Sequence, residues 1–184
     1  MYNKEIYWSW NKCIEKKDIT KFNKYIEKNF DYYEKNTSFD PLKKNAVTKV
    51  ISYGKLKKFL RPFIQCCQKT ANENFGYTLN KLYDVDGCLL NIYSSSNTGN
   101  YGWHIDEALE PHVDIKLTLL INLSTEDYTG GKLFINRGTE SCLKELDTPG
   151  SALMFKSHIL HKVTPVTKGE RKTLTIFLSG PAFK

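Results

Sequence analysis

The chain has 184 residues, of which 40% are hydrophobic and 13% aromatic, and its net charge is +7. This supplies enough apolar material for one well-filled domain and excludes a largely disordered chain. No apolar run approaches the roughly 18–20 residues of a membrane span, and the N-terminus lacks the hydrophobic segment of an export signal. The five cysteines are scattered, so we expect reduced thiols in the cytoplasm and no zinc-finger site.

The positive charge is concentrated in the N-terminal part of the chain. Residues 1–80 contain 16 Lys and Arg against 8 Asp and Glu, a balance of +8, whereas residues 81–184 contain 11 against 12, a balance of −1. A solvated basic helical surface explains this excess most simply. Attraction of an acidic partner, nucleic acid included, is the alternative that the charge leaves open.

The first 80 residues are expected to form a helical support region. Four segments follow one another: one or two amphipathic helices over residues 7–29, a polar connection over 30–45, a short strand over 46–53 and a helix over 55–75. Asp18 is a suitable N-cap in the first helical segment. Pro62 should kink or restart the last helix, because proline lacks the N–H that a helix interior requires.

The residue pattern changes after residue 80, where short apolar runs alternate with turn signals. The runs are Cys88–Ser94, Ile115–Leu123, Lys132–Ile135, Ser151–Phe155, Ile159–Val163 and Lys172–Leu178. Turns such as Gly130-Gly131 and Pro149-Gly150 separate them. Many short strands with Gly and Pro turns indicate a sandwich or a double-sheet barrel. The expected fold is therefore α+β and mainly β, a single domain in which residues 1–80 support a catalytic core at 81–184.

Four polar side chains of this core have the composition of an iron site with a carboxylate anchor. His104 and Asp106 are one residue apart, His161 follows 55 residues after Asp106, and Arg171 follows ten residues later. Two His and one carboxylate leave half of an octahedral Fe(II) site open for ligands. On a strand, His104 and Asp106 would share one face. Arg171 cannot lose its proton, and its planar fork matches a carboxylate.

Rival candidates are present in the same region: a second H-x-D pair, His112 and Asp114, and a third histidine, His158. We favour His104 and Asp106, because they follow the segment SSSNTGNYGW and lie a loop's length before the long apolar strand. We favour His161 over His158 because its ten-residue spacing to Arg171 fits a hairpin of two antiparallel strands.

At the level of motifs, residues 88–181 resemble the Fe(II)/2-oxoglutarate-dependent oxygenases, specifically the prolyl-4-hydroxylase-like branch with its compact microbial and phage-encoded members. The resemblance is carried by Tyr93, WHID at 103–106, KLTLLINLS at 116–124, YTGGKL at 128–133, PGSALMF at 149–155 and LHKVTPVTKGER at 160–171. It implies a double-stranded β-helix, or jelly roll, supported by the N-terminal helices. The implied roles are Fe(II) ligation by His104, Asp106 and His161, binding of the distal carboxylate of 2-oxoglutarate by Arg171, and lining of the co-substrate pocket by Tyr93 and Thr175.

The resemblance also implies the reaction, which is hydroxylation of an unactivated C–H with release of succinate and CO2. Fe(II), 2-oxoglutarate and O2 take part, with ascorbate as a supporting reductant, and a prolyl residue of a peptide or protein is the favoured substrate. Tyr101 and Trp103 are expected to contact it, and Ser94–Asn100 forms either a lid or a plain connecting loop. The alternatives are another amino acid, a small metabolite or a nucleobase as substrate, or a metal-binding jelly-roll module without catalysis.

Overall fold

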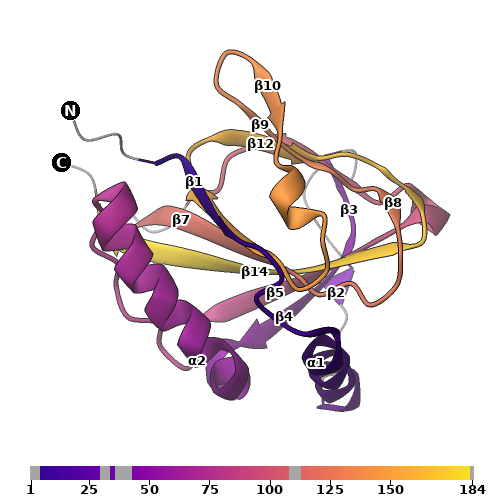
Figure 1. Ribbon diagram of the computed structural model, residues 1–184, viewed down its shortest axis with the longest axis horizontal. Coiled ribbons are helices and arrows are strands. Elements are labelled where there is room, and N and C mark those ends of the chain that lie inside the picture. Colours follow the sequence, from indigo (N-terminus) through magenta and orange to yellow (C-terminus); the bar gives the residue numbers. More distant parts are fainter. Residues whose placement is uncertain (1–4, 30–33, 36–42, 108–112, 183–184) are drawn as a thin grey trace.

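Two antiparallel β-sheets face each other, and two helices lie against the outer face of the larger sheet (Figure 1). The computed structural model describes residues 5–29, 34–35, 43–107 and 113–182. Within these residues, no helix has the length and apolarity needed to cross a bilayer. The coarse expectation of a mainly β chain with N-terminal helices is confirmed.

The larger sheet has seven strands. In spatial order they are β1 (Tyr7–Trp10), β11 (Ala152–Lys156), β7 (Val113–Asn122), β14 (Glu170–Pro181), β5 (Gly87–Ser94), β4 (Val47–Ser52) and β2 (Glu34–Lys35). The smaller sheet has five strands, in the order β10 (Glu140–Cys142), β9 (Leu133–Asn136), β12 (Leu160–Val163), β6 (Asn100–His104) and β3 (Lys44–Asn45). A separate ladder joins β13 (Val166–Lys168) to β8 (Thr129–Gly130).

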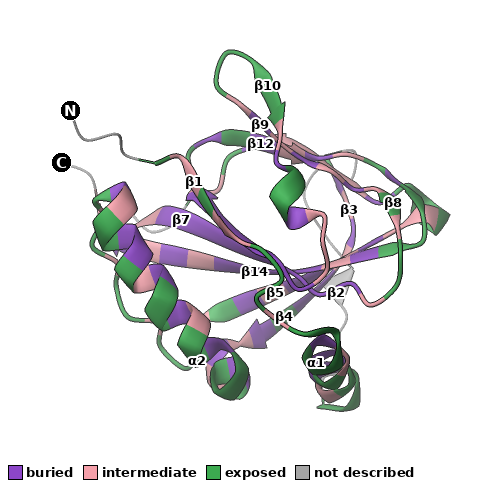
Figure 2. Cartoon of the chain, viewed as in Figure 1, coloured by how far each residue is buried: buried purple, intermediate pink, exposed green. Residues whose placement is uncertain are grey.

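The central strands β7 and β14 are buried on both faces, as the purple bands along them in Figure 2 show. On β7, Leu117, Leu119 and Ile121 face the helices, whereas Leu120 packs in the second core cluster, between the two sheets. A strand that is buried on both faces reads as a continuous apolar run rather than as an alternating one. This explains the sequence KLTLLINL.

The helices α1 (Lys16–Asn29) and α2 (Tyr53–Thr70) each bury one apolar stripe against the large sheet. This core contains Ile19, Phe22 and Ile26 of α1, Leu56, Leu60 and Ile64 of α2, and Leu119, Ile121, Leu174 and Ile176 of the sheet. These positions recur at helical spacing along each helix, so the stripe faces the sheet throughout. A short π-helix, Ala71–Phe75, continues α2 and ends at Gly76.

The N-terminal region contains more strand than the sequence predicts. The expected helix over residues 7–29 begins only at Lys16, because Tyr7–Trp10 forms the edge strand β1, paired with β11. Aromatic residues suit a half-buried strand better than a helix. The connection expected over residues 30–45 also contributes β2 and β3, one to each sheet. The N-terminal region therefore builds part of both sheets as well as the helical layer.

Helix α2 is continuous through Pro62, so the expected restart does not occur. Pro62 and Lys58, whose carbonyl loses its helical partner, are both exposed. Water can therefore satisfy the freed carbonyl, which lowers the cost of a proline inside a helix.

Candidate active site

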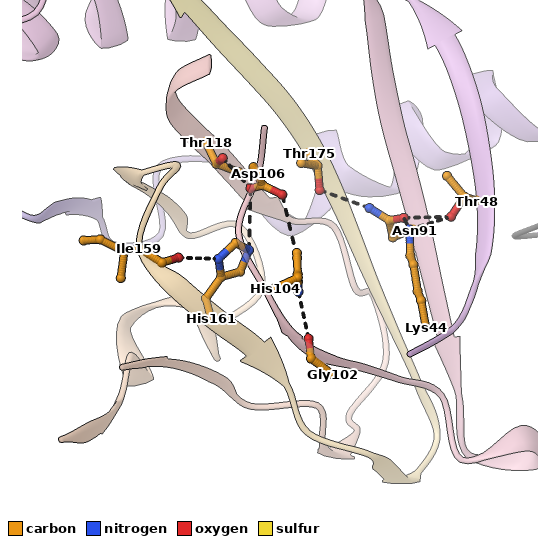
Figure 3. A network of polar contacts seen from close by, with 10 residues as sticks. All are labelled: Lys44, Thr48, Asn91, Gly102, His104, Asp106, Thr118, Ile159, His161 and Thr175. Carbon is orange, nitrogen blue, oxygen red and sulfur yellow. Dashed lines mark hydrogen bonds and ion pairs between the residues drawn. The ribbon is translucent and has the colours of Figure 1, made fainter. Parts of the chain in front are cut away.

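Three potential metal ligands lie together in a cavity between the two sheets (Figure 3). One donor atom from each of His104, Asp106 and His161 falls within 4.8 Å of the others. The His104 Nε2 atom is 3.7 Å from Asp106 Oδ1, and the His161 Nε2 atom is 3.5 Å from Asp106 Oδ2. The two histidines occupy directly paired positions on the neighbouring strands β6 and β12. Sheet pairing thus brings together residues that are far apart in the sequence.

Both imidazoles are oriented by backbone carbonyls. The Nδ1 atom of His104 donates to the Gly102 carbonyl at 2.8 Å, and that of His161 donates to the Ile159 carbonyl at 2.8 Å. Because a carbonyl only accepts, the proton of each neutral ring lies on Nδ1. Each Nε2 lone pair is then free to bind a metal ion, as in most histidine metal sites.

Asp106 lies just beyond the end of β6, so it does not share a strand face with His104 as the sequence predicts. Its backbone N–H donates to the Ser157 carbonyl at 3.0 Å, which ties the loop after β6 to the loop before β12. The Thr118 hydroxyl donates to Asp106 Oδ2 at 2.6 Å. One hydrogen bond therefore holds the backbone of Asp106, and the other holds its carboxylate.

Burial of the cluster favours uncharged forms of its members. It lowers the pKa of His104 to about 3, with a further lowering by His161, and it lowers the pKa of His161 against the opposing charge of Asp106. Burial also raises the pKa of Asp106, opposed by His161 and by the hydrogen bond from Thr118. Neutral histidines are the protonation state that binds metal. A divalent cation would supply the positive charge that the buried carboxylate otherwise lacks, so the donor set fits Fe(II).

An irregularity in β6 brings Tyr101 to the same side as the metal ligands. His161 pairs with His104 and Val163 pairs with Tyr101, so two steps along β12 match three along β6. The extra residue is a β-bulge, which reverses the alternation of side chains. The Tyr101 ring consequently stacks on the His104 imidazole, with centroids 3.5 Å apart.

Arg171 is the second polar group that the sequence places in the cavity. It is 2% exposed, and its guanidinium carbon lies 5.3 Å from the centre of the Tyr93 ring. Among the described residues it forms one hydrogen bond, from Nη1 to the Thr173 hydroxyl at 3.4 Å, and no ion pair with a carboxylate. Buried charges are normally paired, so this cation is suited to a carboxylate from outside the chain.

Gly131 makes room for the Arg171 side chain. Its φ of +58° belongs to the left-handed region, and a Cβ atom there would lie 2.7 Å from Arg171 Cδ. Glycine meets both requirements, of conformation and of space. The second glycine of the motif YTGGKL therefore belongs to the wall of the site.

The hairpin that the sequence predicts for His161 and Arg171 is wrong. Strand β12, with His161, pairs with β6 and β9 in the smaller sheet, whereas β14, with Arg171, pairs with β5 and β7 in the larger one. Residues 164–169 cross between the sheets, and within this segment β13 pairs with β8. The two side chains line the same cavity from opposite sheets. They face each other across the cavity and do not lie on paired strands.

The rival candidates lie elsewhere or outside the described residues. His158 is exposed and is not part of the cluster, and His112 lies outside the described residues. Asp114 forms an ion pair with Lys116, with Asp114 Oδ2 2.9 Å from Lys116 Nζ.

Of the expected substrate contacts, Tyr101 lines the cavity and Trp103 is not among its lining residues. The Trp103 ring lies under the Lys162 ammonium, 4.2 Å from the ring centre. The segment Ser94–Asn100, expected as a lid or a loop, contains a short 3₁₀ turn and is bonded to other segments. Ser95 N donates to the Gly169 carbonyl at 3.0 Å, and Val166 N donates to the Gly99 carbonyl at 2.9 Å.

Sequence reasoning missed a polar network beside the triad, drawn on the right of Figure 3. The Lys44 ammonium donates to the Thr48 hydroxyl at 3.1 Å and to Asn91 Oδ1 at 3.0 Å. Asn91 Nδ2 in turn donates to the Thr175 hydroxyl at 3.0 Å. Burial lowers the pKa of Lys44 to about 8, with Asp106 opposing the change. A lysine gives little signal in a chain where 24 of the 27 basic residues are lysines.

Together, the two facing sheets and the cluster of two histidines and one aspartate define a candidate metal site next to a buried arginine that has no carboxylate partner among the described residues. Residues 88–179 match the model of the 2OG-Fe(II) oxygenase superfamily, which is half of the chain. The chain belongs to this family. Membership implies Fe(II), 2-oxoglutarate and O2 as the reacting partners of the site.

Curated relatives with similar sequences are PKHD-type hydroxylases. One from Alteromonas mediterranea is 44% identical over 89 residues, which are 44% of this chain and 38% of that protein. One from Synechococcus sp. is 38% identical over 82 residues, which are 44% of this chain and 37% of that protein. The matches thus span well under half the length of these relatives.

Solved structures share the fold over nearly the whole chain. A Pseudomonas putida prolyl-4-hydroxylase superposes with a TM-score of 0.71 at 15% identity, covering 94% of this chain and 91% of that one. A prolyl hydroxylase from Trichoplax adhaerens, in complex with a peptide fragment of the hypoxia inducible factor oxygen degradation domain, gives a TM-score of 0.72 at 15% identity. That match covers 96% of this chain and 83% of the other. At this identity the likeness establishes the fold.

Proposed function

We propose that this chain is an Fe(II)- and 2-oxoglutarate-dependent hydroxylase that acts on a prolyl residue of a peptide or protein. The observation that carries the proposal is the placement of His104, Asp106 and His161 in one cavity with the unpaired, buried Arg171. The prolyl substrate is supported by the structural neighbours, two of which are prolyl hydroxylases by name. The peptide is supported by the complex of the Trichoplax protein.

The architecture supports a finer assignment. On this proposal the two facing sheets are the two halves of a double-stranded β-helix, and the chain is a single oxygenase domain in which the N-terminal strands complete both sheets. We further propose a cytoplasmic enzyme, because all five cysteines are unpaired.

In the proposed site, His104, Asp106 and His161 hold iron through their inward-facing donor atoms. Iron bound there with 2-oxoglutarate and O2 supplies the oxidation that converts a C–H to a C–OH, with succinate and CO2 as co-products. The carbonyls of Gly102 and Ile159 hold the two imidazoles in the binding tautomer.

Other residues position the co-substrate and the substrate. Arg171 binds the distal carboxylate of 2-oxoglutarate, which finds there a cation already desolvated by burial. The Tyr93 hydroxyl stays protonated as a donor, because burial raises the pKa of Tyr93 to about 12. Thr175 lines the path between Arg171 and the metal ligands. The Tyr101 ring, stacked on His104, offers an apolar face to the substrate.

The test is succinate formation by the purified chain with Fe(II), 2-oxoglutarate, ascorbate and a panel of proline-containing peptides, with the peptide mass measured in parallel. We expect the peptide to gain one oxygen atom for each molecule of succinate formed above the peptide-free background. Arg171→Ala should raise the KM for 2-oxoglutarate about tenfold to a hundredfold, because a buried charge-assisted pair is lost. Exposed Arg61→Ala is the matched control. Succinate formation that no prolyl peptide stimulates would overturn the substrate assignment.

A further inference from the structure

Lys44 brings a second cation into the cavity, from an unexpected direction. It lies on the edge strand β3, directly opposite Tyr101 of β6, and its side chain is 9% exposed. The ammonium reaches across to the larger sheet, where it donates to Thr48 and Asn91. Figure 3 shows this side chain reaching the same cavity wall that carries Thr175.

The hydrogen-bond partners of this ammonium are neutral throughout the described part of the chain. It has three N–H groups and two acceptors there, and one of these, Asn91 Oδ1, also accepts the Thr48 hydroxyl at 2.8 Å. No carboxylate of the described residues lies within ion-pair distance of it. Lys116 gives the contrast, because it is 4% exposed and has Asp114 Oδ2 at 2.9 Å. Burying a charge without a counter-charge in contact destabilises the folded protein. A purely structural role therefore does not explain why a lysine occupies position 44.

Among the described residues that line the cavity, a count of charges leaves one positive charge unmatched. Lys44 and Arg171 contribute +2 and Asp106 contributes −1 among the lining residues, with both histidines neutral. Fe(II) and doubly charged 2-oxoglutarate add +2 and −2. The remainder is +1, which one further carboxylate would neutralise.

Lys44 and Arg171 are bonded at different points along β14. Through Asn91, the ammonium is linked to Thr175, whereas the Arg171 guanidinium is bonded two residues nearer its own position, to Thr173. On its other side the ammonium lies 5.0 Å from the centre of the Tyr101 ring, which stacks on His104. Lys44 therefore flanks the metal ligands on the side of the proposed substrate contact.

We propose that Lys44 binds a carboxylate of the reacting residue of the substrate. The group that is hydroxylated then carries its own free α-carboxylate, either as a free amino acid or as the C-terminal residue of a peptide. The identity of this residue as proline rests on the proposed function, whereas the requirement for a carboxylate rests on Lys44. An internal residue, whose carboxyl group is an amide, would leave the ammonium unpaired.

The test measures binding rather than turnover. Calorimetric titration of the full chain, loaded with redox-inert Mn(II) and saturating 2-oxoglutarate, compares N-acetyl-L-proline with N-acetyl-L-prolinamide, which differ in the carboxylate alone. We expect the wild type to prefer the acid by about tenfold to a hundredfold, the usual contribution of a hydrogen bond to a charged group. Lys44→Met should reduce the preference to about twofold or less, and Lys44→Arg should retain part of it. The neighbouring exposed Lys43→Met changes charge equally and should leave it intact.

Three results would overturn the proposal. These are equal binding of acid and amide by the wild type, a preference that survives in Lys44→Met, and a loss of 2-oxoglutarate affinity in Lys44→Met as large as that in Arg171→Ala. If Lys44→Met does not fold, the acid and the amide are compared on Lys44→Arg instead.

Further ligands separate the carboxylate site from the proposed substrate. Free L-proline and a peptide ending in proline distinguish the two sources of the carboxylate. N-acetylglycine has the carboxylate without the proline ring. If its binding depends on Lys44 while no prolyl compound is hydroxylated by the Fe(II) enzyme, the carboxylate site holds and the prolyl assignment fails.

Discussion

Replacing Lys44 by methionine should stabilise the metal-free protein at neutral pH, even though it is expected to impair substrate binding. Burial lowers the pKa of Lys44 from 10.5 to about 8. Keeping it protonated at pH 7 therefore costs the folded state roughly 3 kcal/mol, at about 1.4 kcal/mol per pH unit. The variant also loses two hydrogen bonds to neutral acceptors, each contributing about 1 kcal/mol. The net expectation is a gain of about 1 kcal/mol, or about 2–4 °C in Tm.

The same pKa shift predicts how the stability of the wild type changes with pH. Between about pH 8 and pH 10.5, Lys44 is protonated in the unfolded chain and largely neutral in the folded one, so wild-type stability rises with pH across this window. The advantage of Lys44→Met should be greatest below pH 8. It should vanish at about pH 9, where the remaining cost of about 2 kcal/mol equals the two lost hydrogen bonds, and the wild type should be the more stable protein at higher pH. Asp106 and Tyr101 face the ammonium in the wild type. The Lys44 charge lowers the pKa of Asp106, so the variant also shifts the titration of this carboxyl group, in addition to losing that of Lys44.

The assay is urea unfolding of both proteins in EDTA at pH 7, 8, 9 and 10, with Lys43→Met as the control for a lost surface charge. A Lys44→Met protein that is less stable than wild type at pH 7, by a margin that does not vary with pH, would contradict this prediction. It would show that Lys44 fastens the two sheets together and carries no uncompensated charge.

Three further changes test the geometry of the site. Thr118→Val removes the hydroxyl that donates to Asp106, so Mn(II) affinity should fall about tenfold to a hundredfold in a metal titration, and a change under twofold would contradict the assigned role. His161→Ala should abolish measurable Mn(II) binding, whereas His158→Ala should match the wild type, since its side chain is exposed and outside the cluster; equal effects of the two would refute the ligand assignment. Gly131→Ala should weaken 2-oxoglutarate binding about tenfold with Mn(II) affinity retained, because the new methyl group displaces Arg171, and calorimetry showing unchanged co-substrate affinity would contradict this.

The sequence carries the local parts of this site well. The H-x-D pair, the glycine turns and the apolar runs are all short-range signals, and the strands they predict after residue 87 are present in the structure. Strand pairing is a long-range property, which short-range signals do not determine. The spacing of His161 and Arg171 predicts a hairpin, yet the two residues lie in opposite sheets. Their spacing in sequence reflects a crossover between sheets, which spacing alone cannot distinguish from a turn.

The parts that the sequence did not reveal depend on tertiary position. Tyr101 and His104 are three residues apart, and only the β-bulge in β6 places them on one side. Lys44 has no distinguishing neighbours in the sequence, and its importance appears only when the edge strand β3 is seen to border the cavity. The sequence predicts a helix over Tyr7–Trp10, which form a strand, because a strand of four residues has no periodicity of its own.

The separation of the metal ligands from Arg171 has a mechanical consequence. The histidines lie on the smaller sheet and Arg171 on the larger, so a co-substrate held at both ends spans the gap between two packed layers. That gap, about 10 Å between facing sheets, then determines how long a dicarboxylate must be to bind at both ends. Occupancy would also add a link between the sheets to those that Lys44 makes with Thr48 and Asn91, and should slow amide exchange in β12 and β14 together.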